Sequence, residues 1–394
     1  MTAAERILFF YPSNSSGGAE ILYSRLADKL ARDGFNVGVI DYEGGGVASL
    51  IKNEAVDIII FNHDSQVIED LRTCIICPPS IYPYLKYILG NFETMYVLFW
   101  FIHPYNLLAT MPRFSFLSVL ELRYLLNLYK LVFPFRFRIK RLLLLIAENN
   151  NGLYFMDNSS RRENEKIFDL ALKKSLIPIP VSDLPEYEEY NSVLFKPQLT
   201  CGWVGRLADH KYKSLIYLLR ELENRCADDK TVLAFKIIGD GEYIEDVRTF
   251  ADQLEYVRVE YVGSIKNNKL AFYIRSNIDI LFAMGTSALE GAAAGVPTVL
   301  IDATFTKFPN GYLFRWLYET SDFDLASVIG EDSEIIGTKT ISEILKEAAV
   351  NRQEVSRKSY KYVAENHALE LSAEILLNAV KRNRLRIKDI YKYL

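Results

Sequence analysis

Cysteine is scarce in this sequence, and so are the features that mark secreted, membrane-spanning or nucleic-acid-binding proteins. Four cysteines among 394 residues cannot form the disulfide framework of a small secreted domain. The 46 Lys and Arg nearly balance the 50 Asp and Glu, so the net charge of −4 gives no reason to expect nucleic acid as a partner. No apolar run approaches the roughly 20 residues of a membrane-spanning helix, and the N-terminus lacks the pattern of a signal peptide. We therefore expect a cytoplasmic protein.

Metal-binding motifs are also scarce. Cys74 and Cys77 form a Cys-x-x-Cys pair, but no second pair stands at zinc-finger spacing. The segment 73–77 is typical of a strand, in which cysteine is a small buried hydrophobic residue. No Asp-x-Asp motif stands at the end of a predicted strand to hold a divalent ion on a diphosphate. We expect no metal and no bound cofactor.

What the sequence does contain is an alternation of short apolar runs and helical patterns, present in two halves. Hydrophobic residues make up 50% of the chain, and its length suits two domains. The alternation is typical of β-α-β units with buried parallel strands. Strands are predicted at residues 7–11, 37–41 and 56–61 in the first half, and at 201–204, 232–238, 257–262, 278–282 and 298–301 in the second.

The boundary between the halves is predicted near residues 182–198, where prolines cluster and periodicity is lost. The sequence after residue 341 is typical of helices. We expect an N-terminal domain over residues 1–185, a C-terminal domain over 198–370 and a basic helix over 371–394.

The second half places glycines and cations at the ends of predicted strands. Gly205 and Arg206 follow one strand, and Lys211 stands at the start of the next helical pattern. Gly239 and Gly241 follow the next strand. Ligands of open α/β sheets bind at the carboxyl ends of strands, and Arg and Lys donate hydrogen bonds to phosphate. The pattern predicts a diphosphate site at this edge.

The segment from Gly285 to Pro297 is the most informative in the chain. Thr286 and Ser287 are good caps for a helix, and the free N–H groups of that helix would face an anion. Glu290 lies one turn inside the helix, where its carboxylate can accept hydrogen bonds from ribose hydroxyls. We predict that this segment binds a nucleotide.

A second glycine turn follows the first strand of the chain. Gly17 and Gly18 there let the backbone approach a ligand at a helix N-terminus, although the turn is neither a Walker A motif nor Gly-x-Gly-x-x-Gly. Glu20 follows in the first turn of the helix. It is a candidate for the lining of a cleft, and an ordinary first-turn carboxylate is the alternative.

Together these motifs resemble those of the GT-B glycosyltransferases of the family 4 type, also called glycosyltransferase group 1. The resemblance implies an α/β fold of two facing Rossmann-like domains with parallel sheets and a C-terminal helix crossing back to the first domain. It implies that the second domain binds a nucleotide-sugar and the first an acceptor, and that transfer retains the anomeric configuration and needs no metal. It rests on Gly17-Gly-Ala-Glu20, Gly205-Arg-Leu-x-x-x-Lys211, Ile238-Gly-Asp-Gly241 and Glu290-Gly-Ala-Ala-Ala-Gly-Val-Pro297, in this order and spacing.

Roles for individual residues follow from the same resemblance. It implies that Arg206 and Lys211 contact the diphosphate, that Glu290 contacts the ribose, and that residues 285–287 contact the phosphates through backbone amides.

Two residues of the first half match the family less closely. His103 stands roughly where such enzymes place a histidine that faces the acceptor and the sugar, and a core or loop histidine is the alternative. Asp157 is placed similarly, and an N-cap for the helix that begins near Ser160 is the alternative.

One position departs from the family pattern. The family usually has a second glutamate eight residues before the ribose glutamate, and this sequence has Phe282 there. Either the donor sugar is recognised differently, as a deoxy sugar would be, or the site is degenerate.

We expect a glycosyltransferase that moves a sugar from a nucleotide diphosphate to a hydroxyl of a surface glycan or its lipid-linked precursor. A GT-B epimerase acting on a nucleotide-sugar and a non-catalytic GT-B partner subunit are the alternatives.

The stretch 82–146 breaks the alternating pattern, since it is dense in Phe, Tyr and Leu with cations interspersed. Residues 117–133 can be drawn as a helix with apolar residues nearly all round, which is either buried or lies on something apolar. One interpretation is that this helix packs on the first sheet. The other is that it docks on the anionic inner face of the cytoplasmic membrane. The cations are Arg113, Arg123, Lys130, Arg136, Arg138, Lys140 and Arg141.

Overall fold

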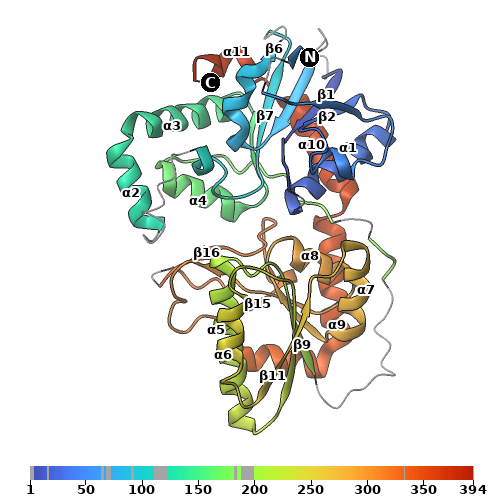
Figure 1. The fold of residues 1–394 in the computed structure, drawn as a ribbon, viewed down its shortest axis with the longest axis vertical. Helices are drawn as coiled ribbons and strands as arrows, with labels where there is room; N and C mark the ends of the chain where they lie inside the picture. Colours follow the sequence, from blue (N-terminus) through green and yellow to red (C-terminus); the bar gives the residue numbers. More distant parts are fainter. Residues whose placement is uncertain are drawn as a thin grey trace. The chain divides into compact units, whose positions relative to one another are not determined.

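The computed structural model describes residues 4–15, 17–63, 66–67, 72–89, 93–110, 122–181, 184–187, 199–331 and 333–393. The chain forms two compact units (Figure 1). Unit 1 comprises Met1–Ser182 and Leu369–Leu394, and unit 2 comprises Asp183–Ala368. Most of the predicted boundary at 182–198 lies outside the described residues. The C-terminal segment of the chain thus belongs to the first unit.

Unit 1 is built on a six-stranded parallel sheet with the strand order β3-β2-β1-β5-β7-β8. Every residue of β1, β2 and β5 is buried, as expected for a parallel sheet covered on both faces. The strands are β1 (Arg6–Phe10), β2 (Val37–Asp41), β3 (Asp57–Ile60), β5 (Thr73–Cys77), β7 (Tyr96–Phe101) and β8 (Leu153–Phe155).

Unit 2 repeats this architecture with the order β11-β10-β9-β12-β13-β15, in which only the last pair is antiparallel. The strands predicted from the sequence are confirmed in both units to within two residues. Those of unit 2 are β9 (Thr200–Val204), β10 (Leu233–Ile238), β11 (Val257–Gly263), β12 (Ile280–Ala283), β13 (Thr298–Leu300) and β15 (Arg315–Trp316).

Helices connect the strands of each sheet, and in Figure 1 they flank the sheets. None of the described helices is long and apolar enough to span a membrane. Unit 1 contains α1 (Gly18–Arg32), α2 (Leu122–Val132), α3 (Pro134–Asn149), α4 (Asn158–Phe168), α10 (Leu369–Arg382) and α11 (Ile387–Ile390). Unit 2 contains α5 (Asp209–Asp229), α6 (Ile244–Ala251), α7 (Asn267–Asn277), α8 (Thr286–Ala293) and α9 (Ile341–Asn366).

The C-terminal segment is integrated into unit 1 by backbone and side-chain contacts. Helix α10 packs against α1, and the residues after it reach the central strands. The Asn383 side-chain amide donates to the carbonyl oxygen of Val97 at 2.9 Å, and the Val97 amide donates to the carbonyl oxygen of Leu385 at 2.9 Å. The last residues therefore help to cover the β7 strand.

The cysteines confirm their predicted structural role. Cys74 and Cys77 are buried in β5, and none of the four cysteines forms a disulfide. Burial raises the pKa of the Cys74 thiol to about 12, so the thiol stays protonated at neutral pH.

The aromatic and basic stretch contains α2 and α3, and the structure separates its cations into two kinds. The Lys140 side chain is buried: its ammonium donates to the Thr110 hydroxyl at 2.5 Å and lies 5.4 Å from the Tyr82 ring centroid. Its inclusion among the surface cations was therefore wrong. Arg136, Arg138 and Arg141 are exposed on α3, as is Lys130 on α2. Arg113 and the side chain of Arg123 lie outside the described residues.

Candidate active site

The order of the strands in unit 2 marks one position of its sheet as a ligand site. Strands β9 and β12 are neighbours, and the chain runs outward from them in opposite directions across the sheet. The connections after two such strands leave a crevice at their carboxyl ends, where ligands of open α/β sheets bind. Gly205 follows β9 and Gly285 follows β12, so the sequence motifs of unit 2 meet at this crevice.

Helix α8 begins at this edge without a capping side chain. Gly285 occupies the N-cap position with φ +60° and ψ −140°, a conformation that only glycine adopts readily. Thr286 and Ser287, expected as caps, occupy the first two positions of the helix instead. Within the described part of the chain their amide N–H groups have no acceptor, and open space lies over Gly285. The helix N-terminus therefore offers two free donors and a partial positive charge to an anion.

Of the two predicted cations, Lys211 lies in the first turn of α5 and is half-buried. Burial and the positive charge of Arg206 lower the pKa of its ammonium. No ion pair to Lys211 occurs among the described residues. An anionic ligand would supply the missing countercharge, so Lys211 is well suited to bind phosphate.

Arg206 differs from Lys211 in its surroundings. Its side chain is 72% exposed and forms an ion pair with Glu242 at 3.4 Å, which is weak in solvent. The guanidinium can exchange Glu242 for a more highly charged diphosphate at little cost.

Gly239 and Gly241, in the turn after β10, pack closely against the turn after β9 and do not face open space. A Cβ atom on Gly239 would stand 2.2 Å from the carbonyl oxygen of Gly205, and one on Gly241 would stand 2.4 Å from that of Leu207. The Leu207 amide also donates to the carbonyl oxygen of Asp240 at 3.0 Å. These two glycines therefore position the turn that carries Arg206.

Glu290 and Phe282 have different environments. Glu290 is half-buried in the second turn of α8. The Phe282 side chain is fully buried in the core of unit 2, where its ring lies edge-on to Phe314 at a centroid distance of 6.1 Å. Phe282 therefore does not line the crevice, and a role for it in binding the sugar is not supported.

A buried ion pair near this edge was missed by the sequence reasoning. The Arg315 guanidinium donates two hydrogen bonds of 2.8 Å to the Asp302 carboxylate, and both side chains are at most 3% exposed. Burial alone would raise the pKa of Asp302, but the charge of Arg315 and several hydrogen bonds lower it. The available signal in the sequence was a single arginine among aromatic residues at 312–316.

This pair holds a loop against the crevice. The Ser327 amide donates to Asp302 at 2.7 Å, and the Gly285 amide donates to the carbonyl oxygen of Leu325 at 2.8 Å. The same loop contains three non-glycine residues with positive φ: Asp322, Phe323 and Ala326. The Asp302–Arg315 pair thus stabilises a strained loop that fixes the start of α8.

In unit 1, His103 is exposed just beyond the carboxyl end of β7. Its Nδ1 atom accepts a hydrogen bond from the Tyr105 amide at 3.2 Å, which places the proton of the neutral ring on Nε2. His103 can therefore present an N–H donor at this edge.

Glu20 and Asp157, in contrast, are buried and serve the structure around them. Glu20 accepts hydrogen bonds from the hydroxyls of Ser13 and Ser15, the latter at 3.0 Å, and so holds the turn before α1. In this turn Gly17 is the N-cap of α1 and Gly18 its first residue. Asp157 caps α4, since its carboxylate accepts a 2.6 Å hydrogen bond from the Ser160 amide. The structural alternative is favoured for both acids.

No cluster of three His, Cys, Asp or Glu side chains suited to a metal ion occurs among the described residues.

Comparison with known proteins supports this description of unit 2. Residues 198–315 match the family described as glycosyl transferases group 1. No sequence among the curated proteins matches the chain.

Similar folds occur among solved structures. One is a mutant of S. aureus TarM in complex with fondaparinux, α-GlcNAc-glycerol and UDP, with a TM-score of 0.56 and 10% identity over 95% of this chain and 99% of that chain. Another is the lipopolysaccharide outer core galactosyltransferase WaaB, with a TM-score of 0.54 and 13% identity over 95% and 99% of the two chains. A third, described as trehalose-6-phosphate from E. coli bound with UDP-2-fluoro glucose, has a TM-score of 0.57 and 11% identity over 97% and 100%. At these identities the likeness concerns the fold, and it confirms the predicted GT-B class.

Proposed function

We propose that this chain, which carries a group 1 glycosyltransferase domain over residues 198–315, moves a sugar from a nucleotide diphosphate to an acceptor hydroxyl. One observation carries the proposal: the segments that follow the neighbouring strands β9 and β12 contain Lys211, which is half-buried and has no ion pair among the described residues, and the uncapped N-terminus of α8. Adjacent strands lie about 5 Å apart, so the segments after them start close together, which supports one anion site for both features. A diphosphate matches their charge.

The proposed reaction breaks the bond between the anomeric carbon and the diphosphate and forms a bond to the acceptor oxygen. Lys211, Arg206 and the amides of Thr286 and Ser287 stabilise the negative charge that develops on the departing diphosphate. The acceptor oxygen attacks the anomeric carbon from the face that the diphosphate leaves, and the released diphosphate takes the acceptor proton. The configuration is then retained without a side-chain nucleophile. Glu290 accepts hydrogen bonds from the ribose.

The acceptor is proposed to bind at unit 1, where His103 offers its Nε2–H to the acceptor. We propose a glycan or lipid-linked glycan as the acceptor class. Two of the similar structures hold UDP or a UDP-sugar, which makes UDP-sugars the first donors to test.

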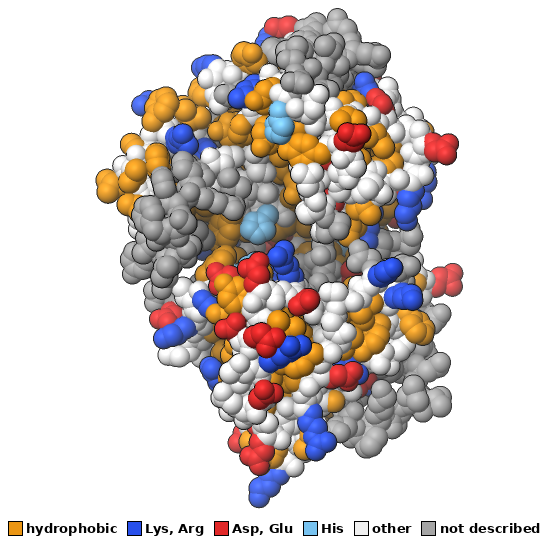
Figure 2. Space-filling view, viewed as in Figure 1, with side chains coloured by type: hydrophobic (Ala, Val, Ile, Leu, Met, Phe, Trp, Pro, Cys, Tyr) orange, Lys and Arg blue, Asp and Glu red, His pale blue; other side chains and the backbone are white. Residues whose placement is uncertain are grey.

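A position at the inner surface of the cytoplasmic membrane is part of the proposal. Leu131, Val132 and Phe135 are 79%, 54% and 72% exposed on α2 and α3. Figure 2 shows hydrophobic and cationic side chains interleaved over these helices. Such a surface suits contact with anionic lipid.

Product analysis with UDP-sugars, with and without a glycan acceptor, tests the proposal. A product that forms without an acceptor would indicate an epimerase, and no donor turnover would indicate a binding subunit.

Lys211→Ala should lower kcat/KM about tenfold to a thousandfold, because a hydrogen-bond donor aimed at developing charge is lost. The control is Lys213→Ala, whose ammonium is held by the Phe305 carbonyl oxygen. Equal effects of the two substitutions on kcat/KM would refute the role of Lys211.

The proposed transfer needs no metal ion. Loss of activity in EDTA and its recovery with manganese would refute this part of the proposal.

A further inference from the structure

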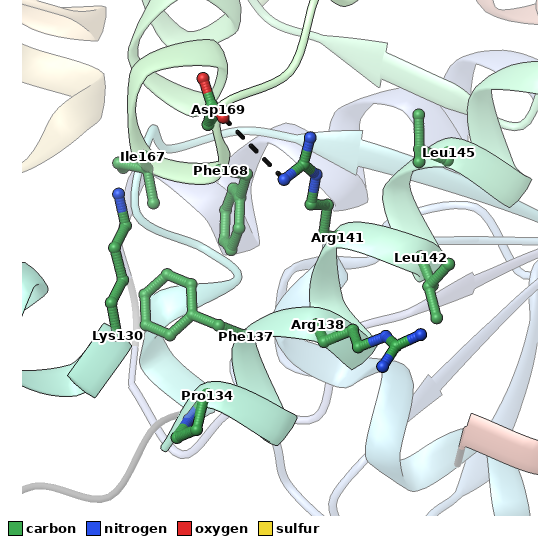
Figure 3. Close-up of a pocket in the computed structure, with 10 residues that line it drawn as sticks. All are labelled: Lys130, Pro134, Phe137, Arg138, Arg141, Leu142, Leu145, Ile167, Phe168 and Asp169. Atoms are coloured by element: carbon green, nitrogen blue, oxygen red, sulfur yellow. Dashed lines mark ion pairs between the residues drawn. The ribbon is translucent and has the colours of Figure 1, made fainter. Parts of the chain in front are cut away.

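A groove of about 600 Å³ lies on unit 1 between α3 and the end of α4, outside the site described above. Its volume is within the range of small-ligand sites. Figure 3 shows the rings of Phe137 and Phe168 close together in its centre, with Leu142 and Leu145 farther along α3. Hydrocarbon placed over this apolar surface would be removed from water.

Cations surround the apolar part of the groove. Lys130, Arg138 and Arg141 contribute three positive charges, and Asp169 contributes one negative charge. The Arg141–Asp169 pair spans 3.9 Å and the Asp169 carboxylate is 91% exposed, so this pair neutralises little of the charge. Arg138 forms no ion pair among the described residues, and in Figure 3 its side chain extends away from Asp169. The groove thus combines an apolar floor with an excess of positive charge.

The residues next to the groove point to the source of its ligand. Leu131 follows Lys130 in α2, and Phe135 follows Pro134, which lines the groove. Both are largely exposed. Apolar side chains that project beside a cationic groove suit insertion into a bilayer. A soluble phosphate would use the cations and leave the apolar floor exposed to water, whereas a phospholipid uses both.

We propose that this groove binds one anionic phospholipid, with its phosphate at Arg138 and Arg141 and part of an acyl chain over Phe137 and Phe168. The proposal rests on the membrane position proposed above, but not on the glycosyl transfer, because none of these residues belongs to unit 2. Binding of a lipid in the groove differs from diffuse attraction to a charged surface in two ways. It depends more on the cations that line the groove than on equally exposed cations outside it. It also depends on the space over the apolar side chains being open to an acyl chain.

The test measures co-sedimentation of the full chain with vesicles of phosphatidylcholine containing phosphatidylglycerol. Arg138→Ser with Arg141→Ser should weaken partition at least about tenfold more than the control pair Arg136→Ser with Arg162→Ser. The control pair removes the same charge from exposed positions of α3 and α4 that do not line the groove. Equal losses in the two pairs would overturn the proposal in favour of diffuse attraction.

A second variant tests the apolar part without changing charge. Leu142→Trp fills the groove and should weaken partition about fivefold or more, while the thermal unfolding of the protein and its binding of UDP stay unchanged. Unchanged partition would overturn the proposal. Glycerol 3-phosphate serves as the soluble probe: if it stabilises the protein against heat as strongly as a short-chain phosphatidylglycerol does, the groove is a phosphate site and the lipid assignment is wrong.

Discussion

Replacing Asp302 by Asn should destabilise unit 2 by about 3 to 5 kcal/mol. The change keeps the shape of the side chain but removes the charge that compensates Arg315, which is 3% exposed. Arg315 would then remain as an unpaired cation in a hydrophobic core. The carboxylate also accepts hydrogen bonds from the Tyr312 hydroxyl at 3.0 Å and the Ser327 amide at 2.7 Å, and an amide cannot accept all of these bonds at once.

Chemical denaturation followed by tryptophan fluorescence measures this loss, because Trp203 and Trp316 are fully buried in unit 2. The matched control is Glu260→Gln, which makes the same chemical change at a carboxylate that is 60% exposed and pairs with Lys236 at 2.6 Å. The control should cost less than about 1 kcal/mol. If Asp302→Asn cost no more than the control, the buried pair would not stabilise unit 2.

Two further predictions concern the nucleotide site and a buried lysine. Glu290→Ala should weaken UDP binding by about 1.5 to 3 kcal/mol if its carboxylate holds the ribose, and calorimetry showing equal affinity in parent and variant would remove that role. Burial, with a smaller effect of Arg136, lowers the pKa of Lys140 to about 8 in the folded protein, below its value of 10.5 in the unfolded chain. Between these values the unfolded chain binds one more proton, so the free energy of unfolding of unit 1 should rise with pH from about 8 upward, by up to about 1.4 kcal/mol per unit. Lys140→Met should abolish this rise relative to the parent, and an identical pH dependence in both proteins would contradict the burial of the charge.

Local patterns determined most of the fold. The strands of both sheets were predictable because a parallel strand buried on both faces is a short continuous apolar run. The turns after β9 and β12 were predictable because glycine is required where backbones approach closely, as where Gly239 meets Gly205 after β9, or where φ is positive, as at Gly285 after β12. The strand order, which places both turns at one crevice, follows the usual rules for such sheets.

The sequence left open the roles of several polar residues, because a side chain's hydrogen-bond partners are not encoded in its neighbours. Glu20 and Asp157 were candidates for a cleft until their bonds to Ser15 and Ser160 were known. Phe282 stands at a position where the family has a glutamate, and only the structure shows that its ring belongs to the core.

The burial of one lysine and of one ion pair depended entirely on tertiary packing. Lys140 looks like its exposed neighbours on α3, and its burial depends on Tyr82 and Thr110, which reach it from distant parts of the chain. Asp302 and Arg315 meet only because β13 and β15 pair antiparallel. A charge can be buried only where the assembled fold supplies its countercharge and hydrogen bonds, and those partners come together through contacts between segments that no local pattern specifies.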